Sequence, residues 1–255
     1  MEGGFDRVGG RGIADVALRL TAGLGRVIFP HFCVSCGLEG QLLCARCEVA
    51  RYAPNRGIFF CLGCGQRLRR QVSCGRRACV SGRWGRGFAA GSYGDPVLRG
   101  LLHLYKYEQV EEAGKVLVDF LATAAGRQAA SVLAGIDCPA VVPIPMHPVG
   151  RAWRGFNQAE ELARAVSAEL ETDFLPSGLS RCLSWRPQAK ISDHSRRIGN
   201  VSGAFRSGAD GIGLGGREVI LVDDVFTTGA TVRECVQALH SAGAGTVSAV
   251  VLLKG

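Results

Sequence analysis

Residues 219–232 read VILVDDVFTTGATV, and this stretch decides the fold. Its first four residues are apolar and predict a short, buried strand of a parallel sheet. Asp223 and Asp224 stand at the carboxyl end of that strand, and a turn rich in hydroxyl groups leads into a helical pattern from Thr231. A strand, a turn and a helix start in this order form an anion site, because unpaired backbone N–H groups and the positive end of the helix dipole meet there.

The residues of the turn indicate which anion it binds. Gly229 allows the backbone to approach a phosphate closely. Three threonines can add hydroxyl donors: Thr227, Thr228 and Thr231. Ionised carboxylates only accept hydrogen bonds, so Asp223 and Asp224 suit the vicinal hydroxyls of a sugar. The pattern therefore predicts a ribose 5-phosphate unit, and its alternative is an ordinary strand–helix turn in which these residues only cap the helix.

An apolar strand followed by two acids, two spacer residues and T-T-G resembles the phosphoribosyl pyrophosphate (PRPP) motif of type I phosphoribosyltransferases. The resemblance implies that Asp223 and Asp224 hold the ribose hydroxyls. It also implies Mg²⁺ bound with the PRPP. By the same resemblance the 5-phosphate is held by Thr227, Thr228, Gly229, Ala230 and Thr231.

Chain length and net charge limit the number of domains and the kinds of partner that the protein can have. A chain of 255 residues is long enough for one or two domains with a substantial core. The net charge of +8 suits phosphate-bearing partners, whether nucleotide, diphosphate or nucleic acid, without choosing among them. The chain has no run of 18 uncharged apolar residues and no secretory signal pattern. We therefore expect a cytoplasmic protein without a membrane span.

The first segment, residues 1–30, is predicted to contain an amphipathic helix. Apolar residues recur at helical spacing over 13–29, and Pro30 follows them. A helix that packs on its own protein is the simpler interpretation, and a helix on a membrane surface is the other.

Cysteines dominate the second segment, residues 31–86. Eight of the eleven fall there, largely as C-x-x-C pairs, which is the spacing of zinc knuckles. The predicted metal ligands are Cys33, Cys36, Cys44, Cys47, Cys61, Cys64, Cys74 and Cys79. Two consecutive groups of four are the simplest arrangement, and interleaved pairing is the alternative. We expect one or two structural zinc ions in a small zinc-ribbon module, the second less regular because Cys74 and Cys79 are widely spaced; a disulfide framework would need an oxidising compartment.

The same segment is strongly basic. Residues 51–86 contain nine arginines and no acid, with Tyr52, Phe59, Phe60 and Trp84 among them. Proteins that bind single-stranded nucleic acid typically use arginines to contact phosphates and aromatic rings to stack on bases. The alternative is a solvated basic face whose aromatic residues fill a small core.

From residue 87 to residue 255 the sequence alternates between strand and helix patterns. Strands are expected near 88–93, 140–144, 179–183, 201–205, 218–223 and 246–253, and helices near 97–107, 111–133 and 157–170. This alternation predicts an α/β fold, a mostly parallel sheet with helices on both faces. Ligands of such sheets bind at the carboxyl ends of the strands.

Two further stretches narrow the resemblance. Residues 141–163, VVPIPMHPVGRAWRGFNQAEELA, resemble the P-V-P…R-G-F-N-Q signature of the ComF family, which includes competence proteins. Residues 188–205, with Gln188, Arg197 and Asn200, resemble the later Q…R…N-V-x-G-A-F block of that family. The family also carries a cysteine-rich zinc module before a type I phosphoribosyltransferase domain. The resemblance covers almost the whole chain beyond residue 30.

The resemblance implies roles for further residues. The loop from Met146 to Arg151 corresponds to the diphosphate loop, where Arg151 and Arg154 are expected to meet phosphate oxygens, unless that loop is simply surface. Residues 188–200 correspond to a mobile lid that brings Arg197 to the diphosphate. Catalytic contributions would come from Asp223, Asp224 and Arg151.

Three functions fit these patterns. The first is a ComF-type protein that binds PRPP or a nucleotide and acts with single-stranded DNA and DNA-uptake proteins. The second is an active phosphoribosyltransferase that moves ribose 5-phosphate to a nitrogen acceptor, with zinc purely structural. The third is a PRPP-sensing regulator without catalysis.

Overall fold

The computed structural model describes residues 32–52, 57–68, 74–80, 84–133, 139–182, 204–211 and 214–255. The chain divides into two compact units between Val49 and Ala50. Among the described residues no helix is long and apolar enough to cross a membrane.

The first unit is a small cysteine-bearing loop that leads into helix α2 (Ala45–Tyr52). The N–H of Gly37 donates to the carbonyl of Cys33 at 2.8 Å, and the N–H of Cys33 donates to the carbonyl of Leu38 at 2.8 Å. Gly37 has a φ of 73°, which a glycine adopts without strain. This tight turn brings the first cysteine pair together.

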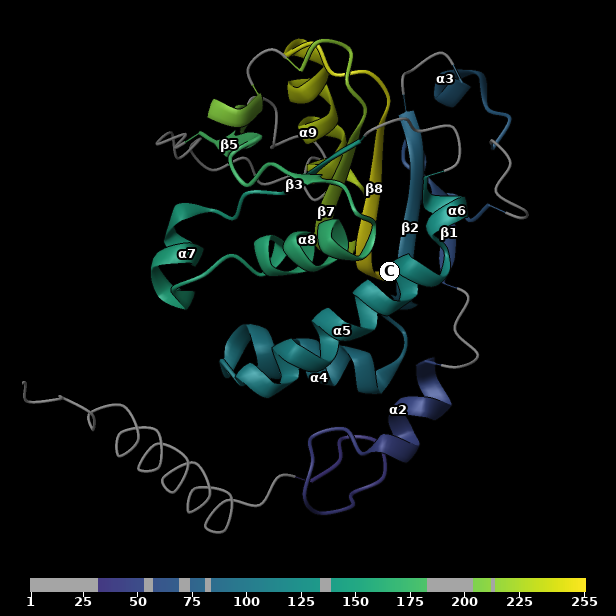
Figure 1. The fold of residues 1–255 in the computed structure, drawn as a ribbon, viewed down its shortest axis with the longest axis vertical. Helices are drawn as coiled ribbons and strands as arrows, with labels where there is room; N and C mark the ends of the chain where they lie inside the picture. The colour runs from purple at the N-terminus through teal and green to yellow at the C-terminus, as the bar shows by residue number, and fades with distance from the viewer. Residues whose placement is uncertain are drawn as a thin grey trace, which may run out of the picture. The chain divides into compact units, whose positions relative to one another are not determined.

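The second unit is built on a six-stranded sheet in the order β1-β2-β8-β7-β3-β4 (Figure 1). Its strands are parallel except β1, which pairs antiparallel with β2 at the edge. The strands are β1 (Ile58–Cys61), β2 (Trp84–Ser92), β3 (Ala140–Pro143), β4 (Asp173–Phe174), β7 (Val219–Phe226) and β8 (Val247–Lys254). The four apolar residues that open β7 are fully buried, as expected of a central strand covered on both faces.

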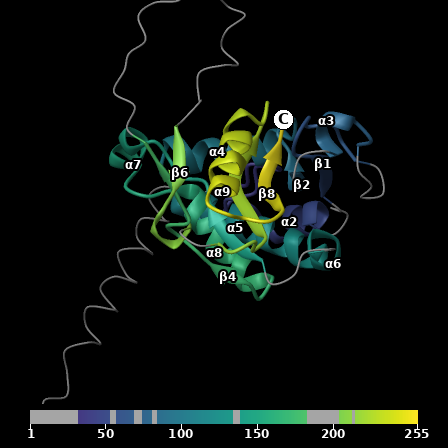
Figure 2. The same cartoon turned by 90° about the horizontal axis from the view of Figure 1, so that it is seen from above.

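Helices cover both faces of this sheet. On one face lie α5 and α8, and α4 packs against α5 (Figure 1). On the other face lies α9, whose Val232, Val236 and Leu239 share a buried cluster with residues of β7 and β8. Figure 2 shows α9 running beside β8. The helices of this unit are α3 (Arg77–Val80), α4 (Pro96–Tyr107), α5 (Glu111–Arg127), α6 (Ala129–Val132), α7 (Pro148–Arg154), α8 (Gln158–Glu169) and α9 (Ala230–Ser241). The expected α/β class, a mostly parallel sheet between helices, is confirmed.

A two-stranded antiparallel sheet and a short 3-10 helix complete the α9 side. Strands β5 (Leu179–Arg181) and β6 (Phe205–Ser207) pair antiparallel, and η2 (Ala209–Gly211) follows β6. Leu179 and Phe205 are buried in the same apolar cluster as α9. The β5–β6 pair therefore packs against α9.

The structure differs from the sequence-based expectations in three places. Residues 148–154 form the helix α7 rather than a loop, because Pro148 suits a first helical position and the ring of His147 accepts a hydrogen bond from the N–H of Val149 at 3.3 Å. Strand β7 continues through both acids to Phe226. The expected module of residues 31–86 is divided, because β1 is hydrogen-bonded into the main sheet and thus belongs to the second unit.

Several expectations concern residues outside the described ranges. They are the amphipathic helix of residues 13–29, the lid of residues 188–200 with Arg197, and four arginines of the basic segment: Arg56, Arg69, Arg70 and Arg83.

Candidate functional site

The turn after β7 is shaped for close approach of a ligand. Gly229 has a φ of 76° and precedes the first residue of α9. A Cβ atom on Gly229 would lie 2.6 Å from a ring carbon of Phe226, so only glycine fits both the backbone conformation and the space. The guanidinium of Arg233 donates to the carbonyl of Thr228 at 2.9 Å and braces the turn, while Thr227 and Thr228 are exposed. The hydroxyls and the first N–H groups of α9 thus gather at one point.

The two acids lie on opposite faces of β7, because side chains alternate along a strand. Asp223 follows Val219 and Leu221 toward the α9 side, which also carries Arg181 of β5. Asp224 faces α4, where its carboxylate pairs with the ammonium of Lys106 at 2.6 Å. Both partners of this ion pair are mostly buried, with side chains 17% and 16% exposed. Each face of β7 therefore carries one of the two carboxylates at the strand end.

The environment of Asp223 favours its neutral form. Burial, followed by the charge of Asp224, raises the pKa of Asp223 to about 7. The N–H of Asp224, which donates to the Asp223 carboxylate at 2.8 Å, and the charges of Lys106 and Arg181 act in the opposite direction without outweighing burial. A carboxyl group with a pKa near 7 is partly protonated at neutral pH. It can therefore accept a hydrogen bond from a hydroxyl group or donate one to it.

Lys106 was missed by the sequence-based reasoning. It sits in the last turn of α4, and in the sequence it reads as an ordinary polar residue of an amphipathic helix. Only the packing of α4 against α5 and the sheet brings it to Asp224. No local pattern announces a contact across this sequence distance.

The end of β3 lies beside the end of β7. Pro143 is in register with Val222, and the N–H of Ile144 donates to the carbonyl of Val222 at 2.9 Å. The side-chain amide of Asn157 donates to the carbonyl of Ile144 at 3.2 Å and accepts from the N–H of Ala159. Asn157 therefore both caps α8 and fixes the loop that contains Met146.

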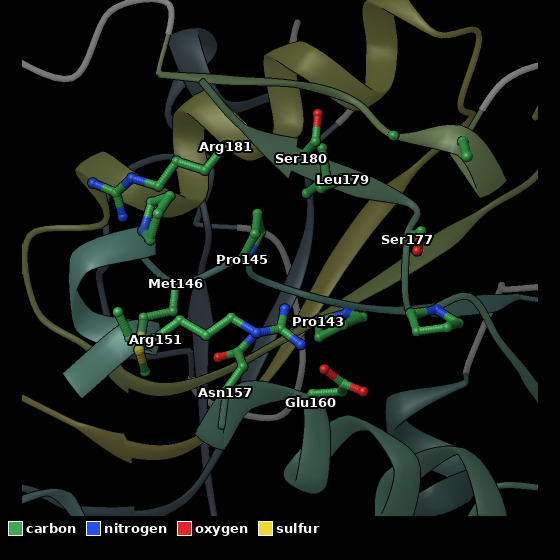
Figure 3. A pocket seen from close by; sticks show the side chains of 15 residues that line it. Pro143, Pro145, Met146, Arg151, Asn157, Glu160, Ser177, Leu179, Ser180 and Arg181 are labelled. Carbon is green, nitrogen blue, oxygen red and sulfur yellow. The ribbon is translucent and has the colours of Figure 1, made fainter. Parts of the chain in front are cut away.

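A cavity of about 560 Å³ opens at this loop, and we call it the α7 cavity (Figure 3). Met146 and Arg151 line it from the loop and α7, and Ser180 and Arg181 line it from β5. Figure 3 shows Arg151 extending from α7 toward Asn157 and Glu160. Neither Arg151 nor Arg181 forms an ion pair with a described residue, so both guanidinium groups can bind an anion.

Arg154 is differently engaged. Its guanidinium lies 5.4 Å from the ring centre of Tyr107 and 5.7 Å from that of Trp153, and it donates to the side-chain carbonyl of Gln158 at 3.4 Å. Its Nε is buried without a hydrogen-bond partner among the described residues. Arg154 thus joins α7 to α4 and α8, and its expected contact with a diphosphate stays a prediction.

A second cavity, of about 640 Å³, lies on the Asp224 side of β7, and we call it the α4 cavity. Val225 and Thr227 line it from the motif, and Lys106 lines it from α4. The α7 cavity thus lies at the carboxyl end of β3, and the α4 cavity lies beside the carboxyl end of β7.

The eight predicted metal ligands form two groups of four that follow chain order. The groups are Cys33, Cys36, Cys44, Cys47 and Cys61, Cys64, Cys74, Cys79. Within each group the sulfur atoms lie within 4.8 Å of one another, and those of Cys36 and Cys44 are 3.7 Å apart. A tetrahedral zinc with Zn–S bonds of about 2.3 Å requires sulfur atoms about 3.8 Å apart. The donor type, number and spacing therefore fit zinc in both groups.

The electrostatics of both groups favour a bound cation. Burial raises the pKa of Cys33, but hydrogen bonds from backbone N–H groups, first that of Cys44, outweigh it and lower the pKa to about 6. A hydrogen bond from the backbone of Arg76 lowers the pKa of Cys74 to about 7. Burial and the neighbouring cysteines raise the pKa of Cys79 to about 12. Four thiolates so close together repel one another, and a divalent metal removes that repulsion.

The second cysteine group abuts the motif strand. Phe60, next to Cys61, stacks on Phe226 with ring centres 4.4 Å apart, and a Cβ on Gly65 would lie 3.3 Å from the Phe226 ring. Phe226 is the ring against which Gly229 rests. The described aromatic residues of the basic segment therefore pack inward: Phe60 is fully buried, and Phe59 lies against Phe88 with ring centres 5.1 Å apart.

Comparison with known proteins agrees with this geometry. Residues 149–255 match the family described as Phosphoribosyl transferase domain. The DNA utilization protein YhgH of Escherichia coli O157:H7 is 29% identical over 203 residues, which cover 79% of this chain and 86% of that protein. Competence protein F of Haemophilus influenzae is 27% identical over 223 residues, covering 84% and 93%. Competence protein ComFC of Streptococcus pneumoniae is 33% identical over 113 residues, covering 44% and 47%.

The matched domain contains β7, its turn and α9, and the two cysteine groups precede it along the chain. The resemblance drawn from the sequence motifs agrees with these comparisons: residues 149–255 are similar to the phosphoribosyltransferase domain, and most of the chain is similar to DNA utilization protein YhgH and competence protein F.

Proposed function

We propose that this protein binds PRPP, or a related ribose phosphate, at the carboxyl end of β7. The 5-phosphate would lie in the turn from Thr227 to Thr231, and the ribose hydroxyls would meet Asp223 and Asp224. The observation that carries the proposal is the Gly229 turn, where a left-handed backbone and the nearby Phe226 ring require glycine directly before α9. In the structure the N–H of Ala230 donates to the hydroxyl of Thr228 at 3.4 Å, and a bound phosphate would take the place of that hydroxyl.

The α7 cavity suits the diphosphate of PRPP. It lies at the end of the strand next to β7, and Arg151 and Arg181 line it. Planar guanidinium groups bind phosphate oxygens in pairs. Mg²⁺ would accompany the diphosphate, and the carboxylate of Glu160 lines the same cavity.

Calorimetric titration with PRPP and Mg²⁺ tests this proposal. The wild-type chain should bind, and Asp224→Asn should weaken binding at least tenfold because an amide also presents donors to the hydroxyls. Asp173→Asn is the matched control, since Asp173 is an exposed acid that pairs with Arg217 away from the motif. Equal affinities of the wild type and Asp224→Asn would refute the assignment of the acids.

Arg151→Ala separates the diphosphate from the pentose. It should weaken PRPP binding and leave ribose 5-phosphate binding unchanged, because ribose 5-phosphate has no diphosphate. An equal loss of affinity for PRPP and for ribose 5-phosphate would show that Arg151 does not act on the diphosphate.

Whether the bound PRPP reacts is a separate question with its own assay. In a transfer reaction a nitrogen acceptor forms a bond to C1 of the ribose, while the C1–oxygen bond breaks and its electron pair leaves with the diphosphate. Arginines of the α7 cavity would stabilise that leaving group. Release of diphosphate on adding a base or amine identifies a transferase, and binding without release identifies a PRPP sensor.

A second function, contact with single-stranded DNA, is supported by one surface, and the name of one relative refers to DNA utilization. Tyr107 and Trp153 are 53% and 56% exposed, and Arg154 lies over both rings. Exposed rings with an interleaved arginine are typical of single-strand binding. DNA binding that weakens linearly with the logarithm of salt, and that Trp153→Ala reduces, supports this role; binding unaffected by that change would exclude this surface.

A further inference from the structure

The second cysteine group and the turn after β7 meet at one aromatic ring, that of Phe226. Both lie in the second compact unit. Cys61 is the last residue of β1, and Phe60, the residue before it, stacks on Phe226 with ring centres 4.4 Å apart. Another part of the Phe226 ring lies against Gly229, directly before α9. A single side chain therefore separates the cysteine group from the turn proposed to hold the 5-phosphate.

The Phe226 ring has little room to move. It is only 1% exposed, and the Phe60 ring is fully buried. A Cβ atom on Gly65 would lie 3.3 Å from Cε1 of Phe226, and a Cβ atom on Gly229 would lie 2.6 Å from Cζ. Close-packed interiors pass on a displacement instead of absorbing it. A shift of Phe60 or Gly65 would therefore move Phe226, and Phe226 would move the turn.

The positions of Phe60 and Gly65 depend on the knuckle that contains Cys61 and Cys64. The N–H of Gly65 donates to the carbonyl of Cys61 at 2.7 Å, and the N–H of Cys61 donates to the carbonyl of Gln66 at 2.9 Å. A metal bonded to all four sulfur atoms of the group would tie this knuckle to residues 74–79. Without the metal, four close thiols or thiolates have no such bond and repel one another when ionised.

The strand that leads into the knuckle is weakly supported by the sheet. β1 has four residues and lies at the sheet edge, where it pairs with β2. On its other side Phe60 forms a bridge with Arg67, which follows the same knuckle. Short edge elements open at a lower free energy than central strands. We therefore expect the metal to contribute much of what holds Phe60 against Phe226.

We propose that the second cysteine group regulates the ribose phosphate site: metal held there keeps Phe60 and Phe226 in place behind the turn, and loss of that metal lowers the affinity for ribose phosphate. This inference rests on the proposed binding of a ribose phosphate and adds its regulation. Coupling between two binding sites is reciprocal, so ribose phosphate raises the metal affinity of the group by the same factor.

Calorimetric titration of the full chain with ribose 5-phosphate tests the first half of the inference. Cys64→Ser removes a ligand of the second group, and Cys36→Ser removes the equivalent ligand of the first group, which lies in the other compact unit. The affinity should be at least about fivefold lower in Cys64→Ser than in Cys36→Ser, the lower end of typical coupling between sites. Metal analysis of the same samples checks which group is filled.

Zinc release tests the reciprocal half. The Cys36→Ser chain holds zinc in the second group alone, so competition with a chelating dye reports that group. Saturating ribose 5-phosphate should lower its zinc dissociation constant by the factor found in the titration. The Cys64→Ser chain, with zinc in the first group alone, is the matched control, and its zinc release should not respond to the ligand.

Two neighbouring phenylalanines test the path. In the Cys36→Ser chain, Phe60→Leu keeps the four cysteines of the second group but removes the ring that stacks on Phe226. Zinc should still bind, and ribose 5-phosphate should no longer change its affinity. Phe59→Leu is the matched control, because Phe59 points to the other face of β1 and packs on Phe88. It should retain the coupling.

The outcomes separate this inference from the function on which it rests. If the wild-type chain does not bind ribose 5-phosphate, the proposed function fails and the regulation with it. If it binds and Cys64→Ser binds equally well, the regulation is refuted while the ribose phosphate site stands. A weaker Cys64→Ser without any effect of the ligand on zinc release also refutes it, because the substitution then acts by damaging the fold. Coupling that survives Phe60→Leu would refute the role of the ring.

Discussion

Replacing Gly229 by alanine tests the physical basis of the phosphate turn. Two costs are expected. The left-handed backbone, with a φ of 76°, costs a non-glycine residue about 1–2 kcal/mol. The new Cβ would lie 2.6 Å from the Phe226 ring, well inside the contact distance of about 3.5–4.0 Å.

The second cost depends on whether Phe226 can move. Phe226 is only 1% exposed and is held between Phe60 and the Gly65 turn of the second cysteine group. Forcing such a ring aside resembles overpacking a core, at about 1–3 kcal/mol. The total expected for Gly229→Ala is therefore about 3 kcal/mol of unfolding free energy.

Gly216→Ala separates the two costs. Gly216 has a φ of 84° but nothing within 4 Å of a Cβ, so only the backbone cost of about 1–2 kcal/mol applies. Denaturant unfolding measures both variants, and PRPP titration should show at least a tenfold loss for Gly229→Ala and none for Gly216→Ala. Adding Phe226→Leu should recover part of the clash cost.

Equal destabilisation by the two glycine changes would show that Phe226 does not constrain the turn. Unchanged PRPP affinity in Gly229→Ala would contradict the placement of the 5-phosphate.

Three further predictions concern charge and metal. Because the pKa of Asp223 is raised from 3.8 to about 7, the folded state holds a proton that the unfolded state releases between these values. The free energy of unfolding should therefore fall as the pH rises from about 4 to 7, and Asp223→Asn should flatten this dependence in unfolding curves; an unchanged slope would contradict the raised pKa. Lys106→Met leaves Asp224 without its partner and should destabilise the protein by about 2 kcal/mol, between the values of exposed and buried pairs; Lys106→Met with Asp224→Asn should restore part of that loss, and additive effects would argue against coupling. Metal analysis should find two zinc ions per chain, and Cys36→Ser and Cys64→Ser should each remove one; loss of both ions from a single change would contradict separate sites.

Local patterns explain what could be predicted. The strand from Val219, the acids and the glycine turn lie within one short stretch, so hydrophobic run, hydroxyl content and spacing are visible together. The C-x-x-C pairs can be recognised for the same reason, since both cysteines of a zinc knuckle lie in a single turn. Residues 148–154 were expected as a loop because the helix α7 is short and none of its residues is buried, so it carries no apolar periodicity.

The sequence by itself determined the α/β class, the motif at the end of β7 and the two groups of four cysteines, because each depends on residues close together in the chain. Only the tertiary structure decided that Lys106 meets Asp224, that Phe226 rests between the second cysteine group and Gly229, and that one cavity lies at the end of β3 and another beside the end of β7. Those contacts join segments far apart in the chain, and sheet order and helix packing, rather than spacing, bring them together.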